Sequence, residues 1–246
     1  MATSTPTPPP IRPRFSPLNV AHSSQPGDAV LRGVIFDMDG TLCEPQNYMF
    51  KEMRAVLGIP KTTDILDHID SLPGPERASA LAAVRAIEAR AMTAQTPQPG
   101  LARLMSYLDS CGIRKAILTR NFDVPVQHLL SNFLAGFVFH PVVTRDFRPA
   151  KPHPAGVLHI ASDWGLRDSR GAADARGLIM VGDSIDDMTA GRLAGAATVL
   201  LLNDVNKDLA HHEHTDLVIT QLDDLIHLLD NGFQARRRDV QDDIIL

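Results

Sequence analysis

Short apolar runs alternate with helical stretches from residue 32 onward. The runs are rich in β-branched residues, which is typical of strands buried on both faces of a parallel sheet. The pattern therefore predicts an α/β fold with a doubly wound parallel sheet. The expected strands lie at residues 33–37, 115–119, 137–143, 178–182, 198–202 and 217–219, and the expected helices at 99–110, 124–134, 154–164, 184–194 and 222–229.

One long segment breaks this alternation. Residues 43–97 contain no convincing strand, but they carry three helical patterns, and the last of these is rich in alanine, the strongest helix former. We predict a small α-helical cap inserted into the sheet domain. The expected helices are at 47–57, 63–71 and 76–93, and the core domain would then consist of residues 29–42 and 98–232.

The two ends of the chain differ from the core in composition. Residues 1–28 are rich in Pro, Ser and Thr and have few large apolar side chains to offset the entropy lost on ordering. Residues 233–246 contain a short basic run that acidic residues follow at once. We predict a flexible tail over residues 1–28 and a solvated tail over residues 233–246.

Overall composition narrows the classes of partner. The formal net charge of -5 provides no basic field to attract nucleic acid or an anionic membrane, so neither is expected as a partner. No run approaches the roughly 18 apolar residues of a membrane span. Cys43 and Cys111 lie in no disulfide or metal-binding pattern. A cytoplasmic protein is expected; the acid-free start of the chain leaves a mitochondrial location as an alternative, although its prolines disfavour a targeting helix.

Two acidic residues follow the first predicted strand. Asp37 and Asp39 come directly after an apolar run, and Gly40 permits close backbone approach to an anion. Neighbouring carboxylates repel each other, so a divalent cation is a natural partner. Asp37 would act as a nucleophile and Asp39 as a general acid and base. Taken alone, the pattern is equally consistent with an acidic turn.

Other polar residues also follow predicted strands. Thr119 ends the second strand, Lys151 precedes a proline in a loop, and Asp183 and Asp187 follow the strand at 178–182. The four motifs in this order resemble those of the haloacid dehalogenase-like hydrolases, in the branch of phosphatases with a small helical cap after the first motif. The resemblance covers roughly residues 32–230 and implies a Rossmann-like core.

The resemblance also implies roles for individual residues. Phosphate oxygens would be bound by Gly40, Thr119 and Lys151, with Lys151 also acting in catalysis beside Asp37 and Asp39. Arg120 departs from the motif of many relatives; it would either clamp a phosphate or carboxylate, or turn outward. A Mg²⁺ cofactor would be held by Asp37, Asp39, Asp183 and Asp187, the last directly or from the outer shell.

Asp186 is ambiguous in this cluster, because acidic residues at a helix start also stabilise the helix dipole. Several cations of the cap are candidates to contact an anionic leaving group, although surface helices commonly carry such charges. They are Lys51, Arg54, His68, Arg77, Arg85 and Arg90.

Three functions fit these residues. The first is a Mg²⁺-dependent phosphatase that hydrolyses a small phosphorylated metabolite, such as a phosphoglycolate-like compound or a sugar phosphate, through an aspartyl-phosphate intermediate. The second is a phosphomutase, which would use the same motifs and shield the aspartyl-phosphate from water. The third is a catalytically silent phosphate-binding module, which the intact set of motif residues disfavours.

Overall fold

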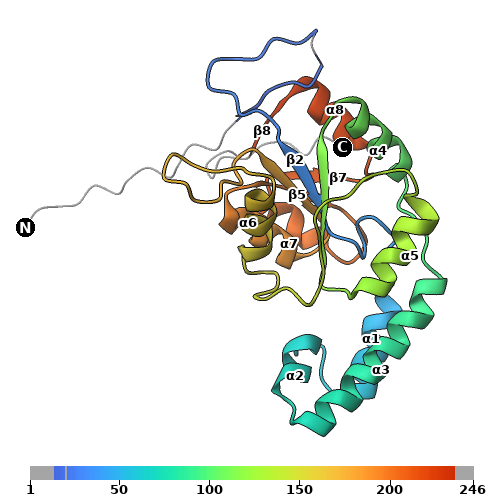
Figure 1. Ribbon diagram of the computed structural model, residues 1–246. Coiled ribbons are helices and arrows are strands. Elements are labelled where there is room, and N and C mark those ends of the chain that lie inside the picture. The colour runs from blue at the N-terminus through green and yellow to red at the C-terminus, as the bar shows by residue number, and fades with distance from the viewer. Residues whose placement is uncertain (1–13, 20, 236–246) are drawn as a thin grey trace, which may run out of the picture.

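A six-stranded parallel sheet forms the centre of the molecule, in a computed structural model that describes residues 14–19 and 21–235 (Figure 1). The strand order is β4-β3-β2-β5-β6-β7, so β2, which precedes Asp37, lies inside the sheet. The strands are β2 (Gly33–Phe36), β3 (Arg114–Leu118), β4 (Val142–Val143), β5 (Leu178–Gly182), β6 (Ala197–Leu201) and β7 (Leu217–Ile219).

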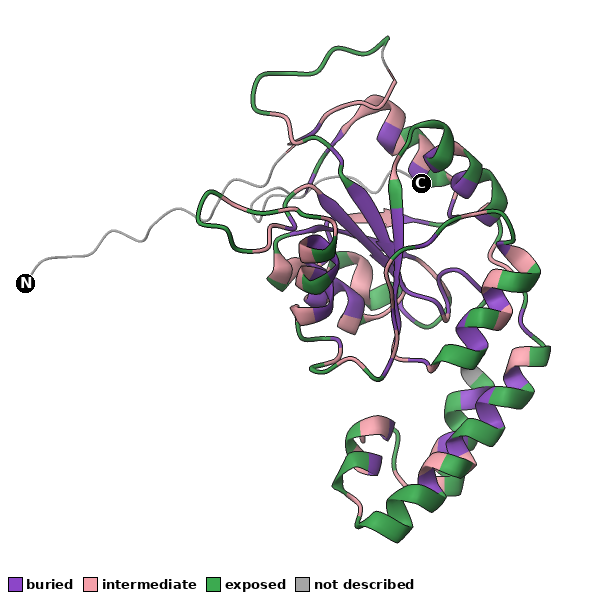
Figure 2. Ribbon diagram, in the orientation of Figure 1, coloured by how far each residue is buried: buried purple, intermediate pink, exposed green. Residues whose placement is uncertain are grey.

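Helices cover both faces of this sheet, as the alternating side chains of β2 show. Val34 and Phe36 belong to the apolar cluster formed with α4, α5 and α8, whereas Ile35 belongs to the cluster formed with α6 and α7. Figure 2 shows the strands buried between these layers. The predicted doubly wound α/β fold is confirmed. The helices are α4 (Leu101–Ser110), α5 (Asp123–Phe133), α6 (Ala155–Asp163), α7 (Ile185–Ala194) and α8 (Asp224–Asn231).

The strand expected at 137–143 is much shorter in the structure. Only Val142 and Val143 form β4, at the edge of the sheet beside β3. Pro141 lacks the N–H that a longer strand would donate. Phe139 is nevertheless buried and packs edge-on against Phe36, with 6.4 Å between the ring centroids. The apolar run at 137–143 is therefore not a continuous buried strand, since Val138 within it is 74% exposed.

Residues 43–97 form a helical insertion with an apolar cluster of its own. Met53, Ile69 and Val84 are among its buried residues. The insertion lies below the sheet domain in Figure 1. Its two ends meet where Cys43 and Pro97 form an isolated antiparallel bridge. The helices are α1 (Asn47–Leu57), α2 (Ile65–Ser71) and α3 (Gly74–Thr93).

Two segments assigned to the tails instead pack on the core. β1 (Arg14–Phe15) pairs antiparallel with β8 (Phe233–Gln234), and Phe15 stacks on Phe233 at a centroid distance of 4.8 Å. The tail prediction is therefore wrong for these strands, because each segment buries its phenyl ring only against a partner distant in sequence. Residues 1–13 and 236–246 lie outside the described part. Within that part, no helix is long and apolar enough to cross a membrane.

Candidate active site

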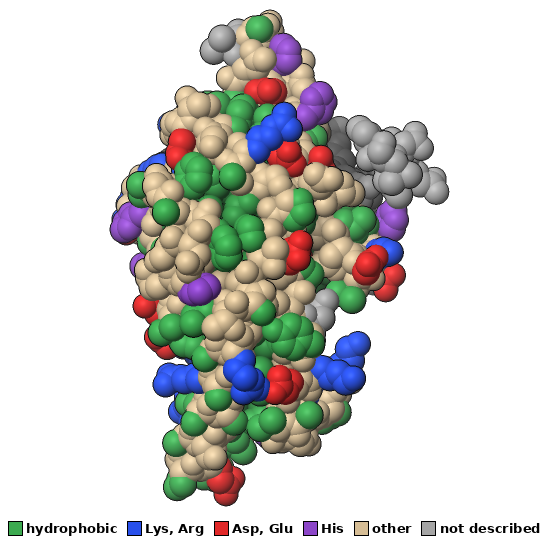
Figure 3. Space-filling view, turned by 90° about the vertical axis from the view of Figure 1, so that its right-hand side faces the viewer, with side chains coloured by type: hydrophobic (Ala, Val, Ile, Leu, Met, Phe, Trp, Pro, Cys, Tyr) green, Lys and Arg blue, Asp and Glu red, His purple; other side chains and the backbone are tan. Residues whose placement is uncertain are grey.

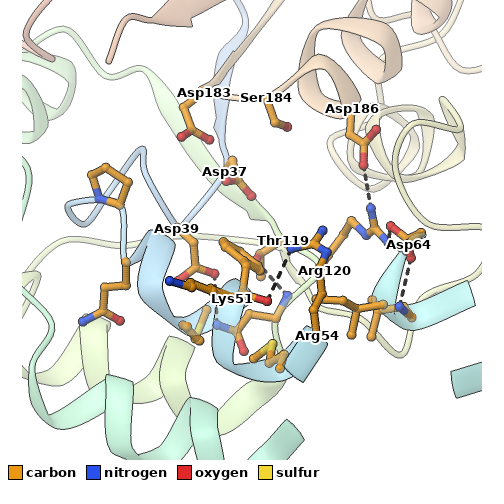
Figure 4. A pocket seen from close by; sticks show the side chains of 18 of the residues that line it. Asp37, Asp39, Lys51, Arg54, Asp64, Thr119, Arg120, Asp183, Ser184 and Asp186 are labelled. Atoms are coloured by element: carbon orange, nitrogen blue, oxygen red, sulfur yellow. Dashed lines mark hydrogen bonds and ion pairs between the residues drawn. The ribbon is translucent and has the colours of Figure 1, made fainter. Parts of the chain in front are cut away.

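A cavity of about 1130 Å³ lies between the sheet domain and the insertion. Residues that follow the strands line one side of it, and residues of α1 and α2 line the other. In open parallel sheets, ligands bind at the carboxyl ends of the strands. Figure 4 shows Asp37, Asp39 and Asp183 at this cavity. The predicted site residues therefore meet at the edge of the sheet where this fold binds ligands.

Lys151 joins two carboxylates at the floor of the cavity. Its Nζ donates to Asp37 Oδ1 at 2.6 Å and to Asp187 Oδ1 at 2.5 Å. All three side chains are buried. Asp37 is fixed by its position after β2, where its N–H donates to the carbonyl of Val181. A buried cation is thus held against the candidate nucleophile.

Asp187 is positioned by the start of α7. Ser184 is the N-cap residue, and its Oγ donates to Asp187 Oδ2 at 2.6 Å, while the N–H of Asp187 donates back to Ser184 Oγ. This capping box satisfies backbone donors that the first helical turn leaves free. It also fixes the rotamer of Asp187. Asp187 therefore caps the helix and contacts Lys151 of the site at the same time.

Asp183 is held from the loop that follows β6. Asn203 Nδ2 donates to Asp183 Oδ2 at 3.0 Å, and Asn206 Nδ2 donates to the Asp183 carbonyl at 2.8 Å. Gly40 lies directly opposite, with a φ of +85°, and a side chain there would collide with the Asp183 carboxylate. Glycine is therefore required at residue 40 both by backbone conformation and by space.

Asp37, Asp183 and Asp187 form a cluster suited to a metal ion. One carboxylate oxygen of each lies within 4.8 Å of the others. Burial raises the pKa of Asp37 well above its ordinary range, and it raises the pKa of Asp183 to about 7, with the charge of Asp187 adding to the shift. Lys151 alone does not neutralise three carboxylates. Hard oxygen ligands with excess negative charge fit Mg²⁺.

Asp39 lies outside this cluster. Its carboxylate accepts a hydrogen bond from Asn121 Nδ2 at 3.0 Å, and burial raises its pKa although this hydrogen bond opposes the shift. Thr119 Oγ1 accepts from the N–H of Asn121, also at 3.0 Å. Asn121 thus links two predicted site residues. The sequence contained a signal for it, because it follows the second strand end by two residues. The role of Asp39 as a metal ligand stays a prediction.

Arg120 turns into the cavity and connects the two halves of the molecule. It donates to both oxygens of Asp64, at 2.8 and 2.7 Å, and to Asp186 Oδ2 at 2.6 Å. Asp64 is the N-cap residue of α2 in the insertion, and Asp186 lies on α7. The outward alternative for Arg120 is therefore wrong, and Asp186 is a partner of this guanidinium. Phosphate binding by Arg120 stays a prediction.

Sequence reasoning missed a second connection between the halves. Arg145, two residues beyond β4, forms an ion pair with Glu88 of α3, and both side chains are buried. Arg145 Nε also donates to the carbonyl of Arg120 at 3.2 Å. Burial raises the pKa of Glu88 to about 7, although Arg145 opposes this shift. No local pattern marks either residue, since they meet only through the fold.

Comparisons with known proteins identify the family of this chain. A family model of haloacid dehalogenase-like hydrolases matches residues 50–195. A protein of Saccharomyces cerevisiae, described as an uncharacterized hydrolase, is 44% identical over 207 residues, which cover 82% of this chain and 92% of that protein. The chain belongs to the haloacid dehalogenase-like hydrolases.

More distant similarities extend to proteins with assigned names. A phosphoglycolate phosphatase of Nitrosococcus oceani is 31% identical over 133 residues, which cover 53% of this chain and 56% of that protein. The crystal structure of a hydrolase from Pseudomonas syringae superposes with a TM-score of 0.61 at 23% identity and covers 81% of this chain and 98% of its own. The latter similarity shows a shared fold.

Proposed function

We propose that this protein is a Mg²⁺-dependent phosphatase that hydrolyses a phosphate monoester of a small metabolite through an aspartyl-phosphate on Asp37. The observation that carries the proposal is the contact of Lys151 with both Asp37 and Asp187 beside Asp183. This arrangement holds a nucleophilic carboxylate against a cation at a ligand cavity. Similarity to a phosphoglycolate phosphatase supports the same class of substrate.

Two chemical steps follow from the residues. In the first, an Asp37 oxygen forms a bond to phosphorus as the ester P–O bond breaks, and Asp39 gives a proton to the leaving alkoxide. In the second, Asp39 accepts a proton from a water molecule that attacks phosphorus, which releases phosphate and restores Asp37. Lys151 stabilises charge on the phosphoryl oxygens.

Other residues would position the phosphoryl group. Thr119 would donate its hydroxyl to a phosphoryl oxygen, and the backbone near Gly40 would supply amide donors. Asp37, Asp183 and Asp187 would hold Mg²⁺, which neutralises negative charge when bound. The insertion would act as a cap that limits access of bulk water to the cavity.

Replacement of the nucleophile tests the proposal. We expect wild type to release phosphate from 4-nitrophenyl phosphate with Mg²⁺ and the Asp37→Asn variant to lose on the order of a thousandfold in kcat, because an amide does not form the intermediate. Chelation by EDTA should abolish wild-type activity and added Mg²⁺ should restore it.

Asp204→Asn is the matched control, since Asp204 is almost fully exposed and pairs only with Lys207 among the described residues. It should retain wild-type activity. Equal activity of wild type and Asp37→Asn would remove Asp37 from the nucleophile role. With a sugar phosphate, accumulation of an isomer in place of free phosphate would instead identify a mutase.

A further inference from the structure

Three cations of the insertion line the same cavity as the Asp37 cluster. They are Lys51 and Arg54 of α1 and Lys61 of the loop before α2. The three-residue spacing of Lys51 and Arg54 places them on one face of the helix. Figure 4 shows both on the insertion side of the cavity, with Asp37 and Asp183 on the opposite side. The cavity therefore has positive side chains facing the acidic floor.

These three cations differ from Arg77 and Arg90, two other cations of the insertion. Among the described residues, none of them has a carboxylate oxygen within 4.0 Å, whereas Arg77 pairs with Asp70 and Arg90 with Glu52. Arg54 donates only to a carbonyl of its own helix, and its Nε is buried without a hydrogen-bond partner in the described part of the chain. Figure 3 shows Lys and Arg side chains in the lower part of the molecule, with acidic groups among them. Positive charge alone therefore does not distinguish Lys51, Arg54 and Lys61. They are distinguished because they line the cavity without a carboxylate partner among the described residues.

The pairing between the two halves explains why these cations are left over. The insertion contributes two acids to the cavity, Asp64 and Glu88, and core arginines bind both. No acid of the insertion is left at the cavity to neutralise its own cations. Meanwhile the floor of the cavity carries more carboxylates than Lys151 neutralises. Charge is therefore separated along the cavity, with the positive end on the insertion.

We infer that Lys51, Arg54 and Lys61 form an anion subsite for a second anionic group of the substrate, a phosphate or a carboxylate on the leaving group. This inference rests on the proposed phosphatase function, in which the first phosphate occupies the Asp37 end. A cavity of about 1130 Å³ exceeds the needs of one phosphate and leaves room for a leaving group beside it. Lys51 and Lys61 supply charge, and Arg54 supplies a planar set of donors.

Matched substrate pairs test the anion subsite. One pair is 2-phosphoglycolate and 2-hydroxyethyl phosphate, which differ in a carboxylate; the other is propanediol 1,3-bisphosphate and 3-hydroxypropyl phosphate, which differ in a phosphate. We expect wild type to prefer the doubly anionic member of at least one pair in kcat/KM. In the variant Lys51→Met/Arg54→Gln/Lys61→Met, that preference should fall by roughly tenfold or more, mainly through KM.

Arg90→Gln is the control, because it removes one charge of the insertion that does not line the cavity, and it should keep the wild-type preference. The single variant Lys61→Met, at an exposed loop residue, replaces the triple variant if the latter does not fold.

The substrate pair that responds identifies the bound anion as a carboxylate or a phosphate. Wild type without preference in either pair, or an unchanged preference in the variant, would overturn the anion subsite. In those cases Asp37-dependent hydrolysis of 4-nitrophenyl phosphate would show that the proposed function still stands, and its absence that the function itself fails.

Discussion

Glu88 is a buried acid whose protonation should change the stability of the protein. Burial raises its pKa from an ordinary value of 4.5 to about 7, Arg145 opposes the shift and Asp39 adds to it. The folded state therefore binds a proton more tightly than the unfolded state, and the resulting stabilisation is present below about pH 4.5 and is lost as the pH rises through about 7.

Glu88→Gln should remove this dependence. The free energy of unfolding of wild type, relative to that of the variant, should fall by up to roughly 3 kcal/mol between those pH values. Denaturant unfolding measured at several pH values checks this, and Glu76→Gln, an exposed replacement on the same helix, is the control. Parallel pH curves for wild type and Glu88→Gln would show that Glu88 does not titrate differently in the two states.

Sequence predicts the site residues that strand ends bring together. Asp37, Thr119 and Asp183 each follow a parallel strand, and such ends converge whatever the details of packing. Asn121 lay within reach of the same reasoning. Arg145 and Glu88 did not, because their pairing depends on how the insertion rests on the core. No spacing in the chain reports that contact.

At the scale of elements, two ion pairs of unequal strength join the helices of the insertion to the core. Glu88 of α3 pairs with Arg145 in a buried position, whereas Asp70 of α2 pairs with Arg148 at 3.2 Å with both side chains exposed. Breaking a buried pair leaves an uncompensated charge and costs about 3–5 kcal/mol, while an exposed pair contributes about 0–1 kcal/mol. The buried pair should therefore control how often α3 opens.

Hydrogen exchange of α3 amides distinguishes the two pairs. Arg145→Met should accelerate exchange across α3 by roughly a hundredfold or more, because Glu88 loses its partner, and Arg148→Met should change it little. Amides of β5 serve as the internal reference for global unfolding. Equal acceleration in both variants, or none in Arg145→Met, would show that apolar packing alone holds α3.

Elements differ in how well the sequence specifies them. The strands beside β2 match their predicted positions to within a residue or two, because runs such as 178–182 are apolar throughout and buried on both faces. β4 is shorter than expected: Val138 is exposed, although Phe139 next to it is buried. Burial and strand formation give the same apolar pattern, so hydrophobicity did not separate them.

At the scale of the whole molecule, β1 and β8 join the two ends of the described chain. Phe15 is only 1% exposed and belongs to the same apolar cluster as Phe36 and Leu229. Composition did not predict this contact, since each segment is short and its partner lies at the opposite end of the sequence. The contact closes a loop that contains the whole core and the insertion, so its loss should affect global stability.

Phe15→Ala should lower the free energy of unfolding by about 3 kcal/mol, because it removes a fully buried ring and its stacking on Phe233. Denaturant unfolding of the full chain measures this. Phe50→Ala is the matched control, since the same change at a side chain that is 39% exposed should cost much less. If both variants lose the same stability, the β1–β8 contact is no more than a surface association. A large loss confined to Phe15→Ala would make the two strands part of the folding unit that supports the sheet and its active site.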